Sequence, residues 1–124
     1  MRLSAHIIKT TASVATLIGC LGLLTPLTVS AADDADITKG KELAFNKKKG
    51  NCLACHDMAG GKLPGNIGPP LVAMKARYPD FAKLKAQISD ARTNNPNTIM
   101  IPFGPHSVLS AKEIDLIAKF TYTL

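Results

Sequence analysis

The chain has 124 residues, with 15 lysines and arginines against nine aspartates and glutamates, so its formal net charge is +6. This length suits a single domain. The basic excess is small and is not interleaved with aromatic side chains, which excludes a typical nucleic-acid-binding surface.

The N-terminal stretch has the pattern of a secretory signal peptide. Two basic residues open it, an apolar stretch covers 11–29, and small residues follow before the first acidic one. This order predicts cleavage after Ala31 or Ala32, which removes a signal peptide over 1–31. The remaining domain, 32–124, is expected in the periplasm without membrane attachment. It has thirteen basic and nine acidic residues, a net charge of +4.

Two alternatives for this stretch stay open. An uncleaved membrane anchor is disfavoured by Pro26 and by the small residues that follow the apolar stretch. Cys20 follows Leu-Ile-Gly, which resembles the signal of a lipidated protein. The apolar stretch continues well beyond Cys20, so we expect this cysteine to be removed with the signal peptide.

Beyond the signal peptide the spacing of apolar residues indicates an all-α domain, and no alternating strand pattern is present. Asp36 is expected to cap a helix that runs to about Lys48. One or two turns are expected over 71–76, and Pro79 is expected to start the next helix. The apolar residues of that helix are Phe81, Leu84, Ile88 and Ala91.

The last predicted helix begins with a capping box formed by Ser110 and Glu113. Its apolar side consists of Ile114, Ile117, Phe120 and Leu124. Two long loops separate the helices, one rich in glycine and proline over 57–70 and one over 94–105. Long loops are uncommon in so small a domain unless they serve a function, so we expect them to wrap a cofactor.

The segment Cys52-Leu-Ala-Cys-His56 has the C-x-x-C-H spacing with which haem c is attached. Two thiols can add to the two haem vinyl groups, and the adjacent histidine can bind the iron. A thioredoxin-like redox pair would need a βαβ pattern, which is not visible. A zinc site lacks ligands, since His106 is the one other histidine after the signal peptide. A structural disulfide would not require His56.

The ring of His56 needs an acceptor for its second N–H group if it binds iron. Backbone carbonyls of the segment 68–71 (Gly-Pro-Pro-Leu) are the natural candidates, because prolines stiffen a loop and carry no N–H of their own.

Four side chains remain as candidates for the opposite side of the iron: Met58, Met74, Met100 and His106. Met58 is too close to His56 in sequence to reach that side easily. Met74 fits a core position, and His106 fits a surface position at a helix start. Met100 lies in a loop far enough along the chain to pass around a haem, so it is the favoured ligand, although packing against haem remains its alternative.

In this order of motifs the chain resembles class I cytochromes c, which implies three to four helices wrapped around one covalently bound haem. Finer matches resemble the SoxX family, the small monohaem subunits of the SoxAX cytochromes of thiosulfate oxidation. They cover Gly50–His56 (GNCLACH), Met100–Gly104 (MIPFG) and Leu109–Ile114 (LSAKEI). The resemblance implies axial ligation by His56 and Met100.

The resemblance also implies partners and a reaction. It implies a periplasmic heterodimer with a SoxA-like haem subunit, in which thiosulfate is coupled oxidatively to a cysteine of the SoxYZ carrier. Electrons would pass to a small cytochrome c or another acceptor. After the signal peptide only Cys52 and Cys55 remain, and haem would consume both. This chain would therefore be the electron-transfer subunit of the L-cysteine S-thiosulfotransferase and not an enzyme alone.

Two rival functions share the haem features. One is a free electron carrier of the cytochrome c type that serves an oxidase. The other is a haem sensor with an open coordination position, against which Met100 argues. The run Lys47–Lys49 suits either an acidic partner or, as we favour, a solvated helix end.

Overall fold

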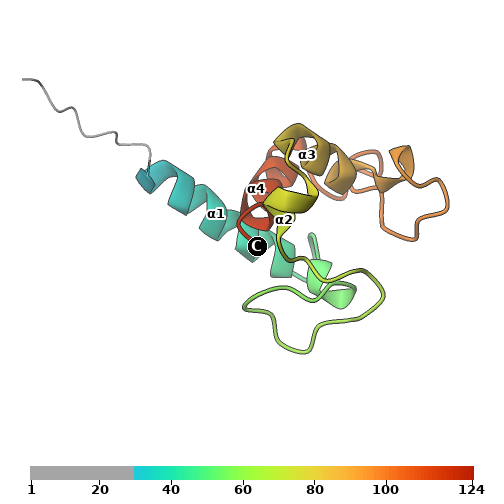
Figure 1. Ribbon diagram of the computed structural model, residues 1–124, viewed down its shortest axis with the longest axis horizontal. Coiled ribbons are helices and arrows are strands. Elements are labelled where there is room, and N and C mark those ends of the chain that lie inside the picture. Colours follow the sequence, from blue (N-terminus) through green and yellow to red (C-terminus); the bar gives the residue numbers. More distant parts are fainter. Residues whose placement is uncertain (1–29) are drawn as a thin grey trace, which may run out of the picture.

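The computed structural model describes residues 30–124, and this part of the chain is mostly helical (Figure 1). Within it, one isolated bridge between Met58 and Leu71 is the nearest approach to a strand pair. The all-α class is thus confirmed for the described residues. The helices are α1 (Ser30–Phe45), α2 (Met74–Arg77), α3 (Phe81–Ser89) and α4 (Ala111–Thr121), with single 3₁₀ turns η1 (Cys52–Ala54) and η2 (Ala91–Thr93).

The predicted signal peptide lies almost entirely outside the described residues, so its cleavage stays a prediction. No helix within 30–124 combines the length and the apolar character needed to cross a membrane.

Helices α1 and α4 pack directly against each other. A Cβ atom built on Gly40 would lie 2.0 Å from the backbone oxygen of Leu116, so the two backbones approach as closely as they do because this residue has no side chain. Beside this contact, Phe45 and Phe120 meet edge to face with ring centroids 5.9 Å apart. Such aromatic pairs stabilise a packed interface beyond the area they bury.

Several helix boundaries differ from the sequence prediction, and Ala91 and Leu124, expected on helices, lie beyond the ends of α3 and α4. Helix α1 already includes Ser30 and ends at Phe45, so Asp36 lies inside it and does not cap it. Its side chain instead pairs with Lys119 on α4. Helix α3 begins after Asp80, whose carboxylate accepts a hydrogen bond from the Ala82 N–H, so the cap lies one residue beyond Pro79.

The capping box of α4 is confirmed. The Ser110 N–H donates to the Glu113 carboxylate at 2.8 Å, and the Glu113 N–H donates to Ser110 Oγ at 3.3 Å. Lys49 also pairs with Glu113 at 2.8 Å. This hydrogen-bonded ion pair and the Ser110 contacts lower the pKa of Glu113 to about 2. Lys49 thus links the end of the α1 region to the start of α4, while Lys47 and Lys48 remain exposed.

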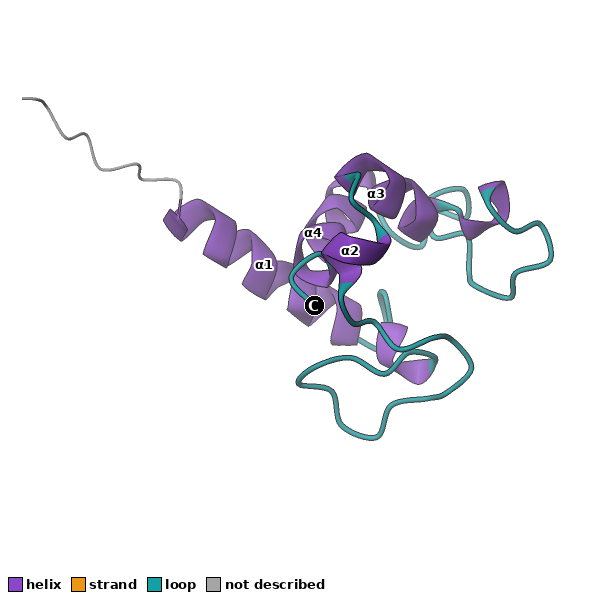
Figure 2. Cartoon of the chain, viewed as in Figure 1, coloured by secondary structure: helices purple, strands orange, loops and turns teal. Residues whose placement is uncertain are grey.

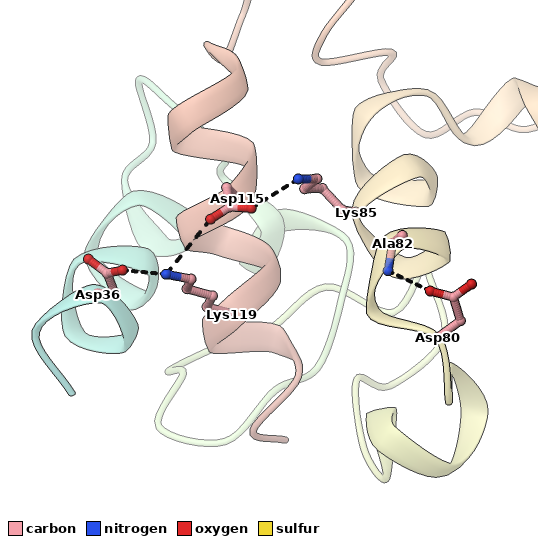
Figure 3. Close-up of polar contacts among 6 residues, drawn as sticks. All are labelled: Asp36, Asp80, Ala82, Lys85, Asp115 and Lys119. Atoms are coloured by element: carbon pink, nitrogen blue, oxygen red, sulfur yellow. Dashed lines mark hydrogen bonds and ion pairs between the residues drawn. The ribbon is translucent and has the colours of Figure 1, made fainter. Parts of the chain in front are cut away.

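A chain of ion pairs crosses the outer surface of three helices (Figure 3). Lys119 on α4 contacts both Asp36 on α1 and, at 3.9 Å, Asp115. Asp115 in turn pairs with Lys85 on α3 at 3.1 Å. The side chains are roughly a third to a half exposed, so each pair contributes little alone, and the network mainly fixes the relative placement of the helices.

The two predicted long loops are present and extend from the helical part (Figure 2). The second is anchored by Phe103, which is buried and whose carbonyl accepts hydrogen bonds from the N–H groups of Val108 and Leu109. Next to it, the Gly104 N–H donates to the Ser89 carbonyl at the end of α3. The second loop is therefore held by a backbone contact at the end of α3.

We expect Gly40→Ala to destabilise the folded protein by a net of up to about 2 kcal/mol. The added methyl group meets a backbone oxygen that cannot rotate away, and overpacking of this kind costs about 1–3 kcal/mol. This exceeds the roughly 0.8–1 kcal/mol that alanine gains over glycine in a helix. Denaturant unfolding of the haem-loaded protein measures the effect. The exposed α1 variant Thr38→Ala is the control, and equal stability of the two variants would contradict the α1–α4 packing.

Candidate functional site

The C-x-x-C-H segment forms one tight turn that begins at Cys52, seven residues after the last residue of α1. Asn51 adopts a left-handed conformation (φ 47°, ψ 33°), which asparagine tolerates better than most residues. The N–H groups of Cys55 and His56 then both donate to the Cys52 carbonyl, at 3.1 and 2.9 Å. This turn fixes the spacing between the two thiols and the imidazole.

The ring of His56 is held from the loop that follows. His56 Nδ1 lies 2.7 Å from the Pro69 carbonyl oxygen, which can only accept, so Nδ1 carries a proton and, in the neutral ring, Nε2 keeps its lone pair. The prediction that the 68–71 segment supplies this acceptor is confirmed. A Cβ on Gly68 would lie 2.4 Å from His56 Cε1, so the ring fits against the loop because position 68 has no side chain.

Backbone hydrogen bonds fasten this loop along the C-x-x-C-H segment. The N–H groups of Gly65, Gly68 and Leu71 donate to the carbonyls of Leu53, Cys55 and Asp57, at 2.9, 2.7 and 2.8 Å. A Cβ on Gly65 would collide with the Ala54 carbonyl at 1.9 Å, which shows how closely the two segments run.

A cavity of about 310 Å³ opens beside His56. This volume is within the range of organic ligand and cofactor sites. Its wall is mainly apolar and draws on both long loops and on α2, α3 and α4. The residues include Cys52, Cys55, His56, Pro69, Met74, Leu84, Ile88, Met100, Phe103 and Ile117.

The four candidates for the second axial ligand of the iron differ in their position relative to this cavity. Met100 lines it, is half-buried, and is held in its loop by a hydrogen bond from its N–H to Thr98 Oγ1 at 3.2 Å. Met74 lines the cavity as well but is only 2% exposed, as expected for a core residue. Met58 is buried outside the cavity wall, and His106 is exposed outside it.

The chemistry of Cys52 argues against a thiolate site. Burial in the apolar wall, with Cys55 acting in the same direction, raises the pKa of the Cys52 thiol to about 11. Without a bound metal, the sulfur is therefore mainly a protonated thiol at neutral pH and a weak nucleophile. Among residues 30–124 no group of three or more His, Cys, Asp or Glu side chains is placed to hold a metal ion.

Residues 35–120 match the protein family described as cytochrome c oxidase, cbb3-type, subunit III. The chain belongs to this family. The match therefore covers the two thiols, the imidazole and all of the cavity wall except Thr121. Comparison with curated proteins gave no significant match.

Membership in a c-type cytochrome family implies a covalently bound haem c, and such cytochromes typically work outside the cytoplasm. The residues present fit this group. Two thiols and one imidazole share an apolar cavity, and a glycine leaves room for the imidazole ring. Cys52 and Cys55 would hold the haem, and His56 would ligate its iron, which supplies a one-electron redox centre.

Reasoning from the sequence missed Arg77, which lines the cavity and donates from Nη1 to the Pro70 carbonyl at 2.8 Å. No motif marks this arginine, because its contact depends on where the short helix α2 lies against the loop.

We expect Gly68→Ala to loosen the His56 contact and to destabilise the haem-loaded protein by about 1–3 kcal/mol, since a methyl group there overlaps the imidazole. Unfolding measurements, together with the NMR signal of the His56 ring proton, test this. Gly61→Ala is the matched control in the same loop, because the nearest atom there is the movable tip of Leu53. An undisturbed ring proton in Gly68→Ala would contradict the assigned packing.

Proposed function

We propose that this chain carries one haem c and transfers single electrons in the periplasm. In this proposal Cys52 and Cys55 attach the haem, and His56 and Met100 ligate the iron from opposite sides. The observation that carries the proposal is that one apolar cavity is lined by Cys52, Cys55 and His56 of the C-x-x-C-H segment and by Met100 from a loop far along the chain.

We further propose that the chain is the electron-accepting subunit of a thiosulfate-oxidising SoxAX complex. The resemblance of three motifs to SoxX supports this assignment. The number of redox and sulfur groups in the chain agrees with this assignment. Coupling thiosulfate to a carrier thiol releases two electrons and needs a sulfur-binding group. One haem accepts one electron, and both cysteines within 30–124 line the cavity. A SoxA-like partner would therefore supply the sulfur chemistry on the SoxYZ carrier.

A free periplasmic electron carrier is the second candidate. One observation favours it specifically: the description of the matching family names an oxidase subunit. A carrier of this kind would exchange electrons with an oxidase and would need no permanent partner.

The first test concerns the sixth ligand. If the Met100 thioether binds the iron, Met100→Ala should abolish the weak near-infrared band of methionine-ligated ferric haem. It should also lower the reduction potential, because a thioether favours the ferrous form. Absorption spectroscopy and redox titration of the haem-loaded protein measure both effects.

Met74→Ala is the control for this test. Met74 is almost fully buried, so its truncation should cost about 2–5 kcal/mol of stability while the near-infrared band remains. Loss of the band in Met74→Ala, with the band kept in Met100→Ala, would transfer the ligand assignment to Met74.

The second test asks which subunit carries out the sulfur chemistry. The chain without its signal peptide should be reduced and reoxidised reversibly, but alone it should not couple thiosulfate to a carrier thiol. Activity should appear on addition of a SoxA-like haem subunit, in an assay with thiosulfate, SoxYZ and an electron acceptor.

The outcomes of this assay separate the candidates. Turnover by the chain alone would contradict the electron-acceptor role. Absence of binding to the SoxA-like subunit, combined with fast electron exchange with an oxidase, would favour the free carrier. Binding should bury an area of about 800 Å² on each partner if the heterodimer is stable.

A further inference from the structure

The loop that orients His56 has a gap in its backbone support. Gly68 and Leu71 each donate a backbone hydrogen bond to the C-x-x-C-H side, at 2.7 and 2.8 Å. Pro69 and Pro70 lie between them and have no N–H group, so they cannot donate. The carbonyl that holds the His56 ring belongs to Pro69, within this gap.

Arg77 supplies a contact in this gap. Its Nη1 donates to the Pro70 carbonyl at 2.8 Å and also lies 3.6 Å from Met74 Sδ. Arg77 stands at the end of the one-turn helix α2, which starts at Met74. A guanidinium is a multiple donor that remains charged, so its hydrogen bond to a carbonyl is stronger than one between neutral groups.

Helix α2 is itself tied to the core of the domain. Met74 is 2% exposed, and its N–H donates to the carbonyl of Leu124, just beyond α4, at 2.9 Å. A continuous series of contacts therefore runs from the end of the chain through Met74 and Arg77 to Pro70. The next residue back, Pro69, holds the His56 ring.

We propose that Arg77 is the positioning residue for His56. It fixes the Pro69–Pro70 segment and thereby the hydrogen bond to His56 Nδ1, which sets the basicity of the imidazole as an iron ligand. This inference rests on the proposed function, since it concerns His56 as the ligand of a covalently bound haem.

The proposed role and a purely electrostatic one predict opposite shifts of the reduction potential. Weakening the hydrogen bond at Nδ1 makes His56 a poorer electron donor, which favours ferrous iron and raises the potential. Removing a positive charge near the iron favours the ferric form instead, and lowers the potential.

The test compares haem-loaded Arg77→Met, Arg77→Lys and Lys75→Met with the unmutated protein. Lys75 lies on the same short helix and contacts the Tyr122 ring, at 5.6 Å, so its variant removes a neighbouring charge without touching Pro70. The main readout is the hydrogen exchange rate of the His56 ring proton, measured by NMR. The backbone N–H of Ile117, in the buried part of α4, reports global opening in the same samples.

In Arg77→Met we expect ring-proton exchange about tenfold faster, the change that corresponds to one lost hydrogen bond. Exchange at Ile117 should be unchanged, and the reduction potential should rise. Arg77→Lys, which keeps the charge and a donor, should recover part of the protection, and Lys75→Met should leave the ring proton as it is. If Arg77→Met does not retain its fold, Arg77→Gln takes its place, with the same changes expected.

Unchanged ring-proton exchange, equal acceleration at Ile117, or a potential that only falls as in Lys75→Met would each overturn the positioning role. Failure of the proposed function has a different signature. In that case haem would be extracted from the unmutated protein by acid–acetone, or the His56 ring signals would show no ligation to iron.

Discussion

The hydrogen bond between the His56 ring and the Pro69 carbonyl is the contact on which the rest of the site depends. It joins a turn that follows α1 to a loop rich in glycine and proline, and it selects Nε2 as the nitrogen left for iron. Its length of 2.7 Å requires the loop to run directly against the imidazole, which Gly68 permits. The loop, in turn, keeps its place because three backbone N–H groups bind the segment it crosses.

Helices α1 and α4 hold the His56 end of this contact in place. Gly40 brings α1 against α4, so the turn after α1 leaves from a fixed point. Lys49, three residues before the turn, pairs with Glu113 at the start of α4. The pKa of Glu113, lowered to about 2 mainly by this pair, keeps the carboxylate charged. Since its folded pKa lies below the ordinary value, the pair stabilises the fold above about pH 4.5, and this contribution is lost as the pH falls toward 2. Contacts with α1 and α4 thus fix the turn that carries the two thiols, in addition to any attachment to haem.

Local chemical signals explain which parts of this arrangement are predictable from sequence. Ser110 and Glu113 interact within one helical turn, so the capping box can be predicted from two residues that lie three positions apart in the sequence. The segment Gly68-Pro69-Pro70 can be predicted to accept the His56 hydrogen bond, because prolines have carbonyl groups but no competing N–H donor. The first helix was misplaced because Asp36 has the chemistry of a cap, whereas its partner is Lys119, 83 residues away. Arg77 was missed for a different reason: its partner is only seven residues away, but it is a backbone carbonyl, which any sequence could offer.

The two candidate functions share every residue of the cavity, so the difference between them must lie outside it. At the mouth of the cavity, Ile67, Ile99 and Ile101 are 63%, 79% and 50% exposed, and they line the same wall as the thiols. Leu63, at 97%, and Val72, at 57%, are exposed apolar side chains beyond that wall. A haem in the cavity would cover part of the first group and leave the second in water. Electron transfer requires a partner to approach the redox centre, and apolar exposed side chains are the surface that a stable partner buries. A permanent partner would bury an apolar surface of standard size, whereas a carrier that binds and leaves an oxidase would keep such a surface exposed for most of its lifetime.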